Sequence, residues 1–537
     1  ASSSSTLLDT TFKIMDMTLK NGKPSAADHG GSVYMHGYYE NNYGDKGHSP
    51  LFQNVIFESN ETKYINEQRK YGGAVYSDGS TPYFRDVTFI DNHTNKYGGA
   101  VYIESTDINK TLVFERTKFL NNHSTSNFID NDVSGGAVYL DYVNKAIFEY
   151  STFDSNYVEI NGGCCQNNGG AINVHRQQDT LIVRNSKFHG NRVFVPDGND
   201  GGRADGGAIS VWNNLADILI YNSLFEGNYV QSGKKYYEGG PDDKYSRGGA
   251  LIIQNVGEWV NEEWVYDQKA SIFNNTFVNN IATTTSDNTN QGQGGAICIQ
   301  DGGVYRLVNN IFWGNRGKDV NTYRNDFVRY NADYEWQIGY NNVESQSIDF
   351  ANANGSNNIS REPKFLLDGS DDEYALSDAS FIIGAGVLKY EDESAPAYDI
   401  LGNARPTTDP DRPDIGAYEN SNITPPYPDK VHDLVAVPAD KSVILSWTEN
   451  IESDLEKYII YQSETAGFTP TSADSIDEST TNSYTATGLT NRTDYYYRVR
   501  AMNKKGNVGE LSEEVTAFPQ YEGPVWWVAI DGNNTNE

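Results

Sequence analysis

Short runs of alternating hydrophobic and polar residues recur along much of the chain, and most of them begin with a glycine pair. In Gly98-Gly99-Ala100-Val101-Tyr102-Ile103, small and aliphatic residues occupy the alternate positions. Further copies begin at residues 30, 72, 135, 169, 206, 248 and 294. A second phrase, Phe-x-x-Asn, accompanies the copies at Phe57/Asn60, Phe89/Asn92, Phe119/Asn122, Phe153/Asn156, Phe188/Asn191, Phe225/Asn228, Phe277/Asn280 and Phe312/Asn315. Eight paired phrases predict a repeat architecture.

The spacing between glycine pairs varies from 26 to 46 residues, which indicates a constant core with variable loops. Between the phrases lie short runs rich in β-branched and aromatic residues, such as residues 112–115 and 181–184, without helical periodicity. Each repeat therefore predicts three short strands. Stacked repeats of this kind form a parallel β-helix, because no coil can bury its apolar face until a neighbour covers it.

Over about residues 10–318 the sequence resembles the right-handed, pectate-lyase-like β-helix proteins of secreted bacterial chains. The same alternation is typical of β-helical surface adhesins and autotransporters. The resemblance implies an all-β, right-handed, three-sided parallel β-helix over residues 1–318 and an extracellular or cell-surface location. It assigns no activity, because this fold supports lyases, hydrolases, adhesins and inert stalks.

The alternation also predicts which side chains point inward and which point outward. Fourth and sixth positions of each phrase, such as Val101 and Ile103, should face the core. The asparagines of Phe-x-x-Asn should stack and satisfy the backbone groups of the turns. Two outer rows remain: Tyr34, Tyr76, Tyr102 and Tyr139 at fifth positions, and Asp78, Glu104, Asp141, His175 and Trp212 at seventh positions.

The outer rows support a first hypothesis, a non-enzymatic stalk or adhesin that contacts an extracellular polysaccharide or a neighbouring surface protein. Tyrosines on successive coils offer flat, amphipathic contact area. We therefore expect ligand contacts at Tyr34, Tyr76, Tyr102, Tyr139 and Trp212, and at the loop residues Tyr236 and Tyr237. A tyrosine ladder that only stabilises the sheet is the alternative interpretation.

The second hypothesis is a polysaccharide lyase or glycoside hydrolase that uses carboxylates on the same sheet. Asp78, Glu104 and Asp141 should lie about 4.8 Å apart on neighbouring strands. Glycosidases need carboxyl groups roughly 5–5.5 Å or 6.5–9.5 Å apart, so either geometry is available. His175 and Arg176 are the only basic pair on this sheet, which disfavours a lyase. All five residues are catalytic candidates, and a solvated charged strand is the competing interpretation.

The charge balance of 41 basic and 73 acidic residues gives a net charge of -32, which makes nucleic acid and anionic membranes poor partners. No apolar run of 18 residues occurs, so no membrane insertion is expected. Acidic loops leave one corner of the repeats. In one of them Asp197, Asn199, Asp200 and Asp205 could bind calcium, the one cofactor considered, although the run lacks a complete calcium-loop pattern.

Residues 319–423 are predicted to close the β-helix. The phrases at residues 383–386, 399–406 and 413–419 resemble the choice-of-anchor ending of secreted bacterial β-helix proteins. That resemblance implies export and attachment to the cell surface, and no catalysis.

A proline-rich linker opens residues 424–519, which resemble a fibronectin type III β-sandwich. Trp447 matches the buried tryptophan of that domain, and Tyr495 matches its tyrosine corner. Residues 520–537 resemble the first strand and turn of a further, truncated domain. We therefore expect the chain to be part of a longer multidomain protein.

Overall fold

The computed structural model describes residues 12–521 except 25–28, 37, 40–44, 47–48, 63–69, 106–108, 127–131, 161–165, 178, 198–201, 213–215, 234–244, 255–257, 261–262, 266–268, 286–291, 301–302, 318–326, 330–334, 345–356, 407–411, 423–424 and 426. The chain divides into two compact units, residues 1–377 with 386–421, and residues 378–385 with 422–537. In the described part, no helix has the length and apolar character needed to cross a membrane.

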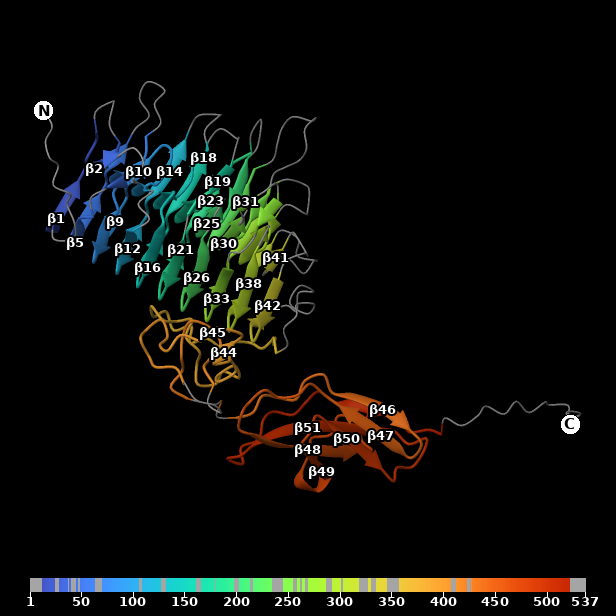
Figure 1. The fold of residues 1–537 in the computed structure, drawn as a ribbon. Helices are drawn as coiled ribbons and strands as arrows, with labels where there is room; N and C mark the ends of the chain where they lie inside the picture. Colours follow the sequence, from blue (N-terminus) through green and yellow to red (C-terminus); the bar gives the residue numbers. More distant parts are fainter. Residues whose placement is uncertain are drawn as a thin grey trace, which may run out of the picture. The chain divides into compact units, whose positions relative to one another are not determined.

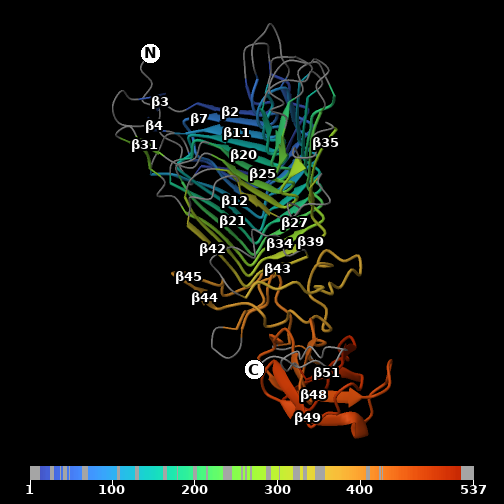
Figure 2. The ribbon, with the colours of Figure 1, turned by 90° about the vertical axis from the view of Figure 1, so that its right-hand side faces the viewer.

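The first unit is a parallel β-helix, whose coils follow one another from the blue to the yellow-green strands of Figure 1. The strands that follow the glycine pairs form one parallel sheet, here called sheet 1. Its strands, several of which are labelled in Figure 2, are β2 (Val33–His36), β7 (Val75–Asp78), β11 (Val101–Glu104), β15 (Val138–Asp141), β20 (Ile172–His175), β25 (Ile209–Trp212), β30 (Leu251–Gln254), β37 (Ile297–Gln300) and β41 (Phe327–Arg329).

Sheet 2 contains two rows of strands. Its first row is β1 (Lys13–Lys20), β5 (Leu51–Glu58), β8 (Tyr83–Arg85), β12 (Thr111–Glu115), β16 (Lys145–Glu149), β21 (Thr180–Arg184), β26 (Asp217–Tyr221), β33 (Lys269–Phe273), β38 (Val304–Val308) and β42 (Glu335–Gly339). Its second row is β9 (Thr88–Ile90), β13 (Lys118–Leu120), β17 (Thr152–Asp154), β22 (Lys187–His189), β27 (Leu224–Glu226), β34 (Thr276–Val278), β39 (Ile311–Trp313) and β43 (Asn342–Val343). The long strand β5 pairs with both β8 and β9, which joins the two rows.

Sheet 3 follows the asparagine turn and comprises β6 (Glu61–Thr62), β10 (His93–Thr94), β14 (His123–Ser126), β18 (Tyr157–Ile160), β23 (Arg192–Phe194), β28 (Tyr229–Ser232), β35 (Ile281–Thr284) and β40 (Arg316–Gly317). A short sheet 4 lies just before the glycine pairs, with β19 (Gln166–Asn168), β24 (Arg203–Asp205), β29 (Ser246–Arg247) and β36 (Gly292–Gln293).

Most coils thus contain at least four strands rather than the three that the sequence predicts. The extra break lies between the two rows of sheet 2. There one residue per coil, such as Asn185 or Asn222, has a positive φ and turns the chain. Asparagine tolerates this conformation better than most residues, because its short polar side chain bonds locally.

The core of the β-helix confirms the predicted inward positions. Val101 and Ile103 are fully buried, like their counterparts in the other coils. The phenylalanines of Phe-x-x-Asn stack face to face along the axis, with ring centroids 4.7 Å apart for Phe119 and Phe153. Since strands repeat at about this spacing, a ring at the same position in every coil meets its copy in the next.

The asparagines form the predicted ladder. Asn156 Nδ2 donates to the carbonyl of Phe119 at 2.9 Å and to Asn191 Oδ1 at 2.9 Å. Its own Oδ1 accepts from the backbone nitrogen and side chain of Asn122, both at 3.0 Å. Each asparagine therefore satisfies buried backbone groups of its neighbour, which a turn buried between coils cannot satisfy with water.

Replacement of Asn156 by alanine should destabilise the β-helix by about 2–3 kcal/mol, because buried groups of Asn122 and Phe119 lose their partners. The change is measured as a shift of the urea midpoint, with hydrogen exchange in the adjacent turns. Lys118→Ala, a substitution at an exposed position one coil away, is the control. Equal midpoints for the two variants would contradict a stabilising ladder.

Parallel pairing continues beyond the predicted boundary at residue 318. β42 pairs with β38 and β43 with β39, so residues 335–343 form a further coil. The asparagines of the turn within sheet 2 also continue, since Asn310 donates to Asn341 and Asn341 to Asn358, each at 3.0 Å. This second ladder has no counterpart in the sequence analysis.

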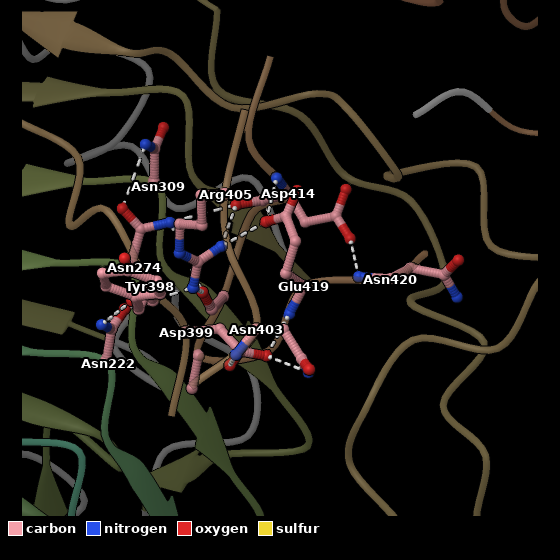
Figure 3. Close-up of polar contacts among 12 residues, drawn as sticks. Asn222, Asn274, Asn309, Tyr398, Asp399, Asn403, Arg405, Asp414, Glu419 and Asn420 are labelled. Carbon is pink, nitrogen blue, oxygen red and sulfur yellow. Dashed lines mark hydrogen bonds and ion pairs between the residues drawn. The ribbon is translucent and has the colours of Figure 1, made fainter. Parts of the chain in front are cut away.

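Residues 387–420, here called the closing segment, lie along the turns of sheet 2, and they contain the strands β44 (Lys389–Tyr390) and β45 (Glu393–Ser394). The segment is bound by three asparagines of positive φ from successive coils (Figure 3). Asn222 donates to the carbonyl of Tyr398, Asn274 to that of Asp414, and Asn309 to that of Val387.

Two of the three phrases that resemble a choice-of-anchor ending, residues 399–406 and 413–419, lie in the closing segment and supply its buried polar contacts. Arg405, almost fully buried, binds Glu419 at 2.6 Å and the carbonyl of Gly416 at 2.9 Å. Asp399 accepts from the backbone nitrogens of Asn403 and Glu419 at 2.7 and 2.9 Å (Figure 3). Arg405 also donates to Asn222 Oδ1 at 3.2 Å, which links this network of the closing segment to the β-helix.

The second unit contains an antiparallel β-sandwich. One sheet is β46 (Val435–Ala439), β47 (Ser442–Ser446) and β50 (Ser483–Thr487), and the other is β49 (Ser475–Ser479), β48 (Leu455–Ser463), β51 (Tyr495–Asn503) and β52 (Val515–Ala517). Trp447 is buried against the edge of Tyr458, with ring centroids 5.1 Å apart. The Tyr495 hydroxyl accepts from the backbone nitrogen of Thr490 at 3.1 Å, which is the predicted tyrosine corner.

Candidate functional site

The outward-facing tyrosines of sheet 1 are packed against one another. Tyr76, Tyr102 and Tyr139 are between 5 and 8% exposed, and their rings stack at 5.2 and 5.4 Å. Tyr71 and Tyr97, which precede glycine pairs, cover this row from outside, and Tyr97 stacks on Tyr139 at 4.4 Å.

The rings of Tyr76 and Tyr102 each have a tyrosine ring on either side, which leaves little of either ring exposed to a ligand. Tyr34 is 53% exposed at the first coil, where it stacks on Tyr76 at 5.3 Å. Burial raises the pKa of Tyr139 well above its usual value, and Asp141 and Asp132 add to the shift. The stacking agrees with the alternative interpretation, a ladder that stabilises the sheet, and the predicted ligand contacts of this row stay a prediction.

Where the tyrosine row ends, a cavity of about 400 Å³ opens on the outer face of sheet 1. Tyrosine at the fifth position gives way there to Asn173 on β20, and smaller or polar side chains leave space above the strands. The cavity is lined by Tyr97, Asp132, Ser134, Tyr139, Asn168, Asn173, His175, Arg176 and Trp212. The structure thus brings together His175 and Arg176 from the catalytic candidates with Tyr139 and Trp212 from the ligand-binding candidates.

His175 lies at the centre of the contacts within this cavity. Its Nδ1 atom is 3.0 Å from Asp141 Oδ1 and 3.4 Å from the Tyr139 hydroxyl. Trp212, at the matching position on β25, stacks on the imidazole with ring centroids 5.1 Å apart. Arg176 lies over the ring of Tyr142 at 4.9 Å and donates to its hydroxyl. The imidazole and the guanidinium are therefore held by neighbouring coils.

Asp132 closes another side of the cavity. The ammonium group of Lys96, itself 1% exposed, binds Asp132 Oδ1 at 2.5 Å and its carbonyl at 2.6 Å, and Tyr97 donates to the other carboxylate oxygen. Burial alone would raise the pKa of Asp132, but Lys96 and Tyr97 together hold this pKa below its usual value. Asp132 is therefore an anionic acceptor near neutral pH.

Two buried acceptors in the lining have no donor among the residues that the structure describes. Asn168 on β19 is 3% exposed and Asn173 on β20 is 1% exposed, and within that part of the chain the Oδ1 atom of each has no hydrogen-bond partner. Buried polar atoms in folded proteins are nearly always paired with protein or with ordered water. Both residues line the cavity, but the two oxygens themselves have almost no accessible surface.

The other two carboxylate candidates lie outside this cavity lining. The register of β7, β11 and β15 places Asp78, Glu104 and Asp141 at matching positions, as predicted. Asp78 is paired with His36 at 3.3 Å, and Glu104 accepts from the Tyr102 hydroxyl at 3.2 Å. Asp141 contacts His175, a residue of the cavity lining.

The predicted calcium ligands are placed only in part. Asp205 is fully buried, and Arg247 binds its two oxygens at 2.9 and 2.6 Å, with Arg203 at 3.3 Å. Burial raises the pKa of Asp205 to about 7, and Arg203 opposes the shift. Asp205 is thus an ion-pair residue, which corrects its prediction as a calcium ligand, because both of its oxygens are engaged.

Asp197 accepts from the Thr285 hydroxyl. Asn199 and Asp200, like Tyr236 and Tyr237, lie outside the described residues. Within the residues that the structure does describe, no group of three or more His, Cys, Asp or Glu side chains is arranged to hold a metal ion.

Sequence reasoning missed the residues that precede the glycine pairs. Tyr97, Ser134 and Asn168 form a bridged row beside the fifth positions, and all three line the cavity. Their signal in the sequence was their fixed distance from each glycine pair, since the coil repeat places them in register. Asp132 has no such periodic signal.

Comparisons with known proteins match parts of the chain. The fibronectin type III family profile matches residues 429–518, and the Chlamydia polymorphic membrane protein repeat matches residues 86–104, which contain one Phe-x-x-Asn phrase and one glycine-pair phrase. An amylopullulanase from Thermoanaerobacter thermohydrosulfuricus is 29% identical over 165 residues, which is 30% of this chain. The chain covers 10% of that enzyme's length.

The solved structures described here each match a part of this chain about as long as one domain. A Fn3-like protein from Clostridium thermocellum is 25% identical, with 18% of this chain and 98% of that protein covered and a TM-score of 0.15. The FN5 domain of Drosophila Lar is 26% identical, with coverages of 17% and 98% and a TM-score of 0.15. Together with the buried Trp447 and the Tyr495 corner, the profile match identifies residues 429–518 as a fibronectin type III domain, joined in this chain to a parallel β-helix.

Proposed function

We propose that this chain is an extracellular surface protein that binds a neutral polysaccharide in the sheet 1 cavity. The observation that carries the proposal is a space of about 400 Å³ lined by Trp212, Arg176 and Asp132. An aromatic ring offers a flat face to a sugar ring, a guanidinium donates to sugar oxygens, and a carboxylate accepts from sugar hydroxyls. The test below measures saccharide binding directly.

The charges around the cavity favour a neutral ligand over an acidic one. Asp132 and the Asp141 carboxylate beside His175 accompany the cation Arg176, and the whole chain carries a net charge of -32. An anionic polymer would meet long-range repulsion on approach. A neutral sugar could accept from Arg176 and donate to the Asp132 carboxylate without that cost.

The surface location is supported by the comparisons rather than by the cavity. The glycine-pair and Phe-x-x-Asn phrases match a repeat of Chlamydia polymorphic membrane proteins, and the second unit contains a fibronectin type III domain. Both agree with a multidomain surface protein of adhesin type. The name of the similar amylopullulanase adds pullulan to the polysaccharides worth testing.

Replacement of Arg176 or Trp212 by alanine should weaken polysaccharide binding at least tenfold, because each removes a wall of the cavity. Binding is measured by affinity electrophoresis and calorimetry with pullulan, soluble starch, mannan, xyloglucan and polygalacturonate. Arg192→Ala is the matched control, since Arg192 lies over the Tyr157 ring at 4.4 Å in the same manner but belongs to sheet 3.

If the Arg176 and Arg192 variants bind the polysaccharide equally strongly, the sheet 1 cavity is not the binding site. Failure of all five polysaccharides to bind would reject carbohydrate as the ligand and leave a neighbouring surface protein as the partner to test. Preference for polygalacturonate would contradict the neutral ligand.

Polysaccharide cleavage is the second candidate function, and one contact favours it. Asp141 and His175 form a hydrogen-bonded pair at 3.0 Å beside Arg176, an arrangement in which a carboxylate orients an imidazole base. Asp132, however, is held ionised and therefore cannot serve as a glycosidase acid. Reducing-end assays with and without calcium distinguish cleavage from binding. Turnover that is lost in His175→Ala would establish an enzyme. Binding without turnover would show that the protein only binds the polysaccharide.

A further inference from the structure

A second and larger cavity lies on the opposite side of the coil, between the first row of sheet 2 and the closing segment. Its volume is about 460 Å³. Strands β16, β21, β26 and β33 supply the floor, and residues 393–398 of the closing segment supply one wall. None of the residues that line it belongs to the sheet 1 cavity.

The floor of this cavity combines apolar side chains, Leu219 and Phe273, with charged groups that are paired. Arg184 binds Glu149 Oε2 through Nε at 2.8 Å and through Nη2 at 2.5 Å, and it donates to the Tyr221 hydroxyl at 3.1 Å. Ser271 donates to Glu393 at 3.1 Å across to the closing segment. Because Arg184 is already neutralised by Glu149, the floor does not favour a phosphate, sulfate or carboxylate ligand.

Two exposed tyrosines contribute to the cavity wall from different parts of the chain. Tyr150, which follows β16 with a positive φ, is 51% exposed, and Tyr398 of the closing segment is 60% exposed. Asn222 donates to the carbonyl of Tyr398 and so fixes this residue to the β-helix (Figure 3). Unlike the tyrosines of sheet 1, neither ring is buried in a stack.

The groups that line this cavity match the chemistry of a sugar. Asn185, the positive-φ residue that follows Arg184, is one of the lining residues. Exposed aromatic rings offer flat apolar faces, and the hydroxyl, amide and carboxylate groups of the floor offer paired donors and acceptors. Apolar ring faces surrounded by hydroxyls are the chemistry of a sugar.

We propose that the cavity under the closing segment is a second, independent carbohydrate site, which takes one to three neutral sugar units between Tyr150 and Tyr398. The site exists only when the closing segment is bound, because that segment provides Tyr398 and Glu393. A polysaccharide could therefore contact the β-helix on two faces. Two weak sites on one chain raise the apparent affinity for a long polymer.

The test uses the full chain carrying Arg176→Ala, so that binding at the sheet 1 cavity does not contribute. Maltotriose, cellotriose, mannotriose and laminaritriose are titrated by calorimetry and by saturation-transfer NMR. We expect one of them to bind with 1:1 stoichiometry, and both Tyr150→Ala and Tyr398→Ala to weaken that binding at least tenfold. Tyr427→Ala, at a tyrosine that is 57% exposed in the second unit, is the matched control.

Because Tyr150 and Tyr398 are exposed, their alanine variants should keep the thermal midpoint of the parent, which separates lost contacts from lost folding. Absence of binding by all four trisaccharides would overturn the second site, as would binding that both tyrosine variants leave unchanged. If Arg176→Ala has no effect on polysaccharide binding while the tyrosine variants do, the second site stands and the proposed sheet 1 site fails.

Discussion

Replacement of Gly136 by alanine should prevent the β-helix from closing around the fourth and fifth coils. A Cβ atom at Gly136 would lie 2.0 Å from the carbonyl oxygen of Gly170 and 2.7 Å from the backbone of Tyr157. These backbone segments are held in place, since Gly170 N donates to Gly206 and Tyr157 N donates to Asn122 in adjacent coils. The expected loss exceeds about 3 kcal/mol, beyond ordinary overpacking, and should appear as loss of soluble expression or a collapse of the thermal midpoint.

The variant Gly227→Ala measures separately what it costs to place a Cβ atom on a residue of positive φ when no steric clash occurs. Gly227 has a positive φ of 59°, which Gly136 lacks, and a Cβ atom at Gly227 would meet nothing within 4 Å. It should cost only the conformational penalty of about 1–2 kcal/mol. If Gly136→Ala proves as mild as Gly227→Ala, the stacked glycines do not set the spacing of the coils.

Replacement of Arg405 by alanine should release the closing segment from the β-helix. The substitution leaves Glu419 buried without its cation and leaves the carbonyl of Gly416 and the side chain of Asn222 without a donor. Breaking a buried ion pair from one side costs about 3–5 kcal/mol. We expect faster hydrogen exchange and proteolysis within residues 387–420, while the earlier coils keep their protection.

Arg412→Ala is the matched control, because this arginine lies in the same segment and is exposed. The double variant Arg405→Met with Glu419→Gln should recover part of the loss, since no buried charge then remains unpaired. Unchanged exchange in Arg405→Ala would show that the buried pair does not hold the segment. Release of the segment should also abolish trisaccharide binding at the second cavity, because Tyr398 leaves with it.

Periodic features of the fold could be predicted because each coil repeats the contacts of the previous one. Each residue of Phe-x-x-Asn contacts the equivalent residue of the next coil. The contacts of one copy therefore predict the contacts of all the others. The phenylalanine stack and the asparagine ladder follow this rule along the β-helix. The fibronectin type III domain was also evident, since Trp447 and Tyr495 occupy fixed places in its strand pattern.

The functional surfaces depend on departures from that period. The sequence placed the tyrosines outside the coil, and they do point outward from sheet 1. Whether an outward residue meets solvent is decided by residues from another part of the coil, and here Tyr71 and Tyr97 cover the row. Whether an outward-facing side chain is buried therefore depends on the tertiary structure. The alternation of residues along one strand does not predict it.

The sequence alone determined that this chain forms a parallel β-helix and a fibronectin type III domain, because both folds arise from contacts at regular spacing. Tertiary structure alone decided where cavities lie. The first arises where Asn173 replaces tyrosine beside Asn168, and the second where the closing segment crosses β16 to β33 more than a hundred residues away in sequence. Such cavities join side chains from loops of unequal length, and only the folded register of the coils brings those side chains together.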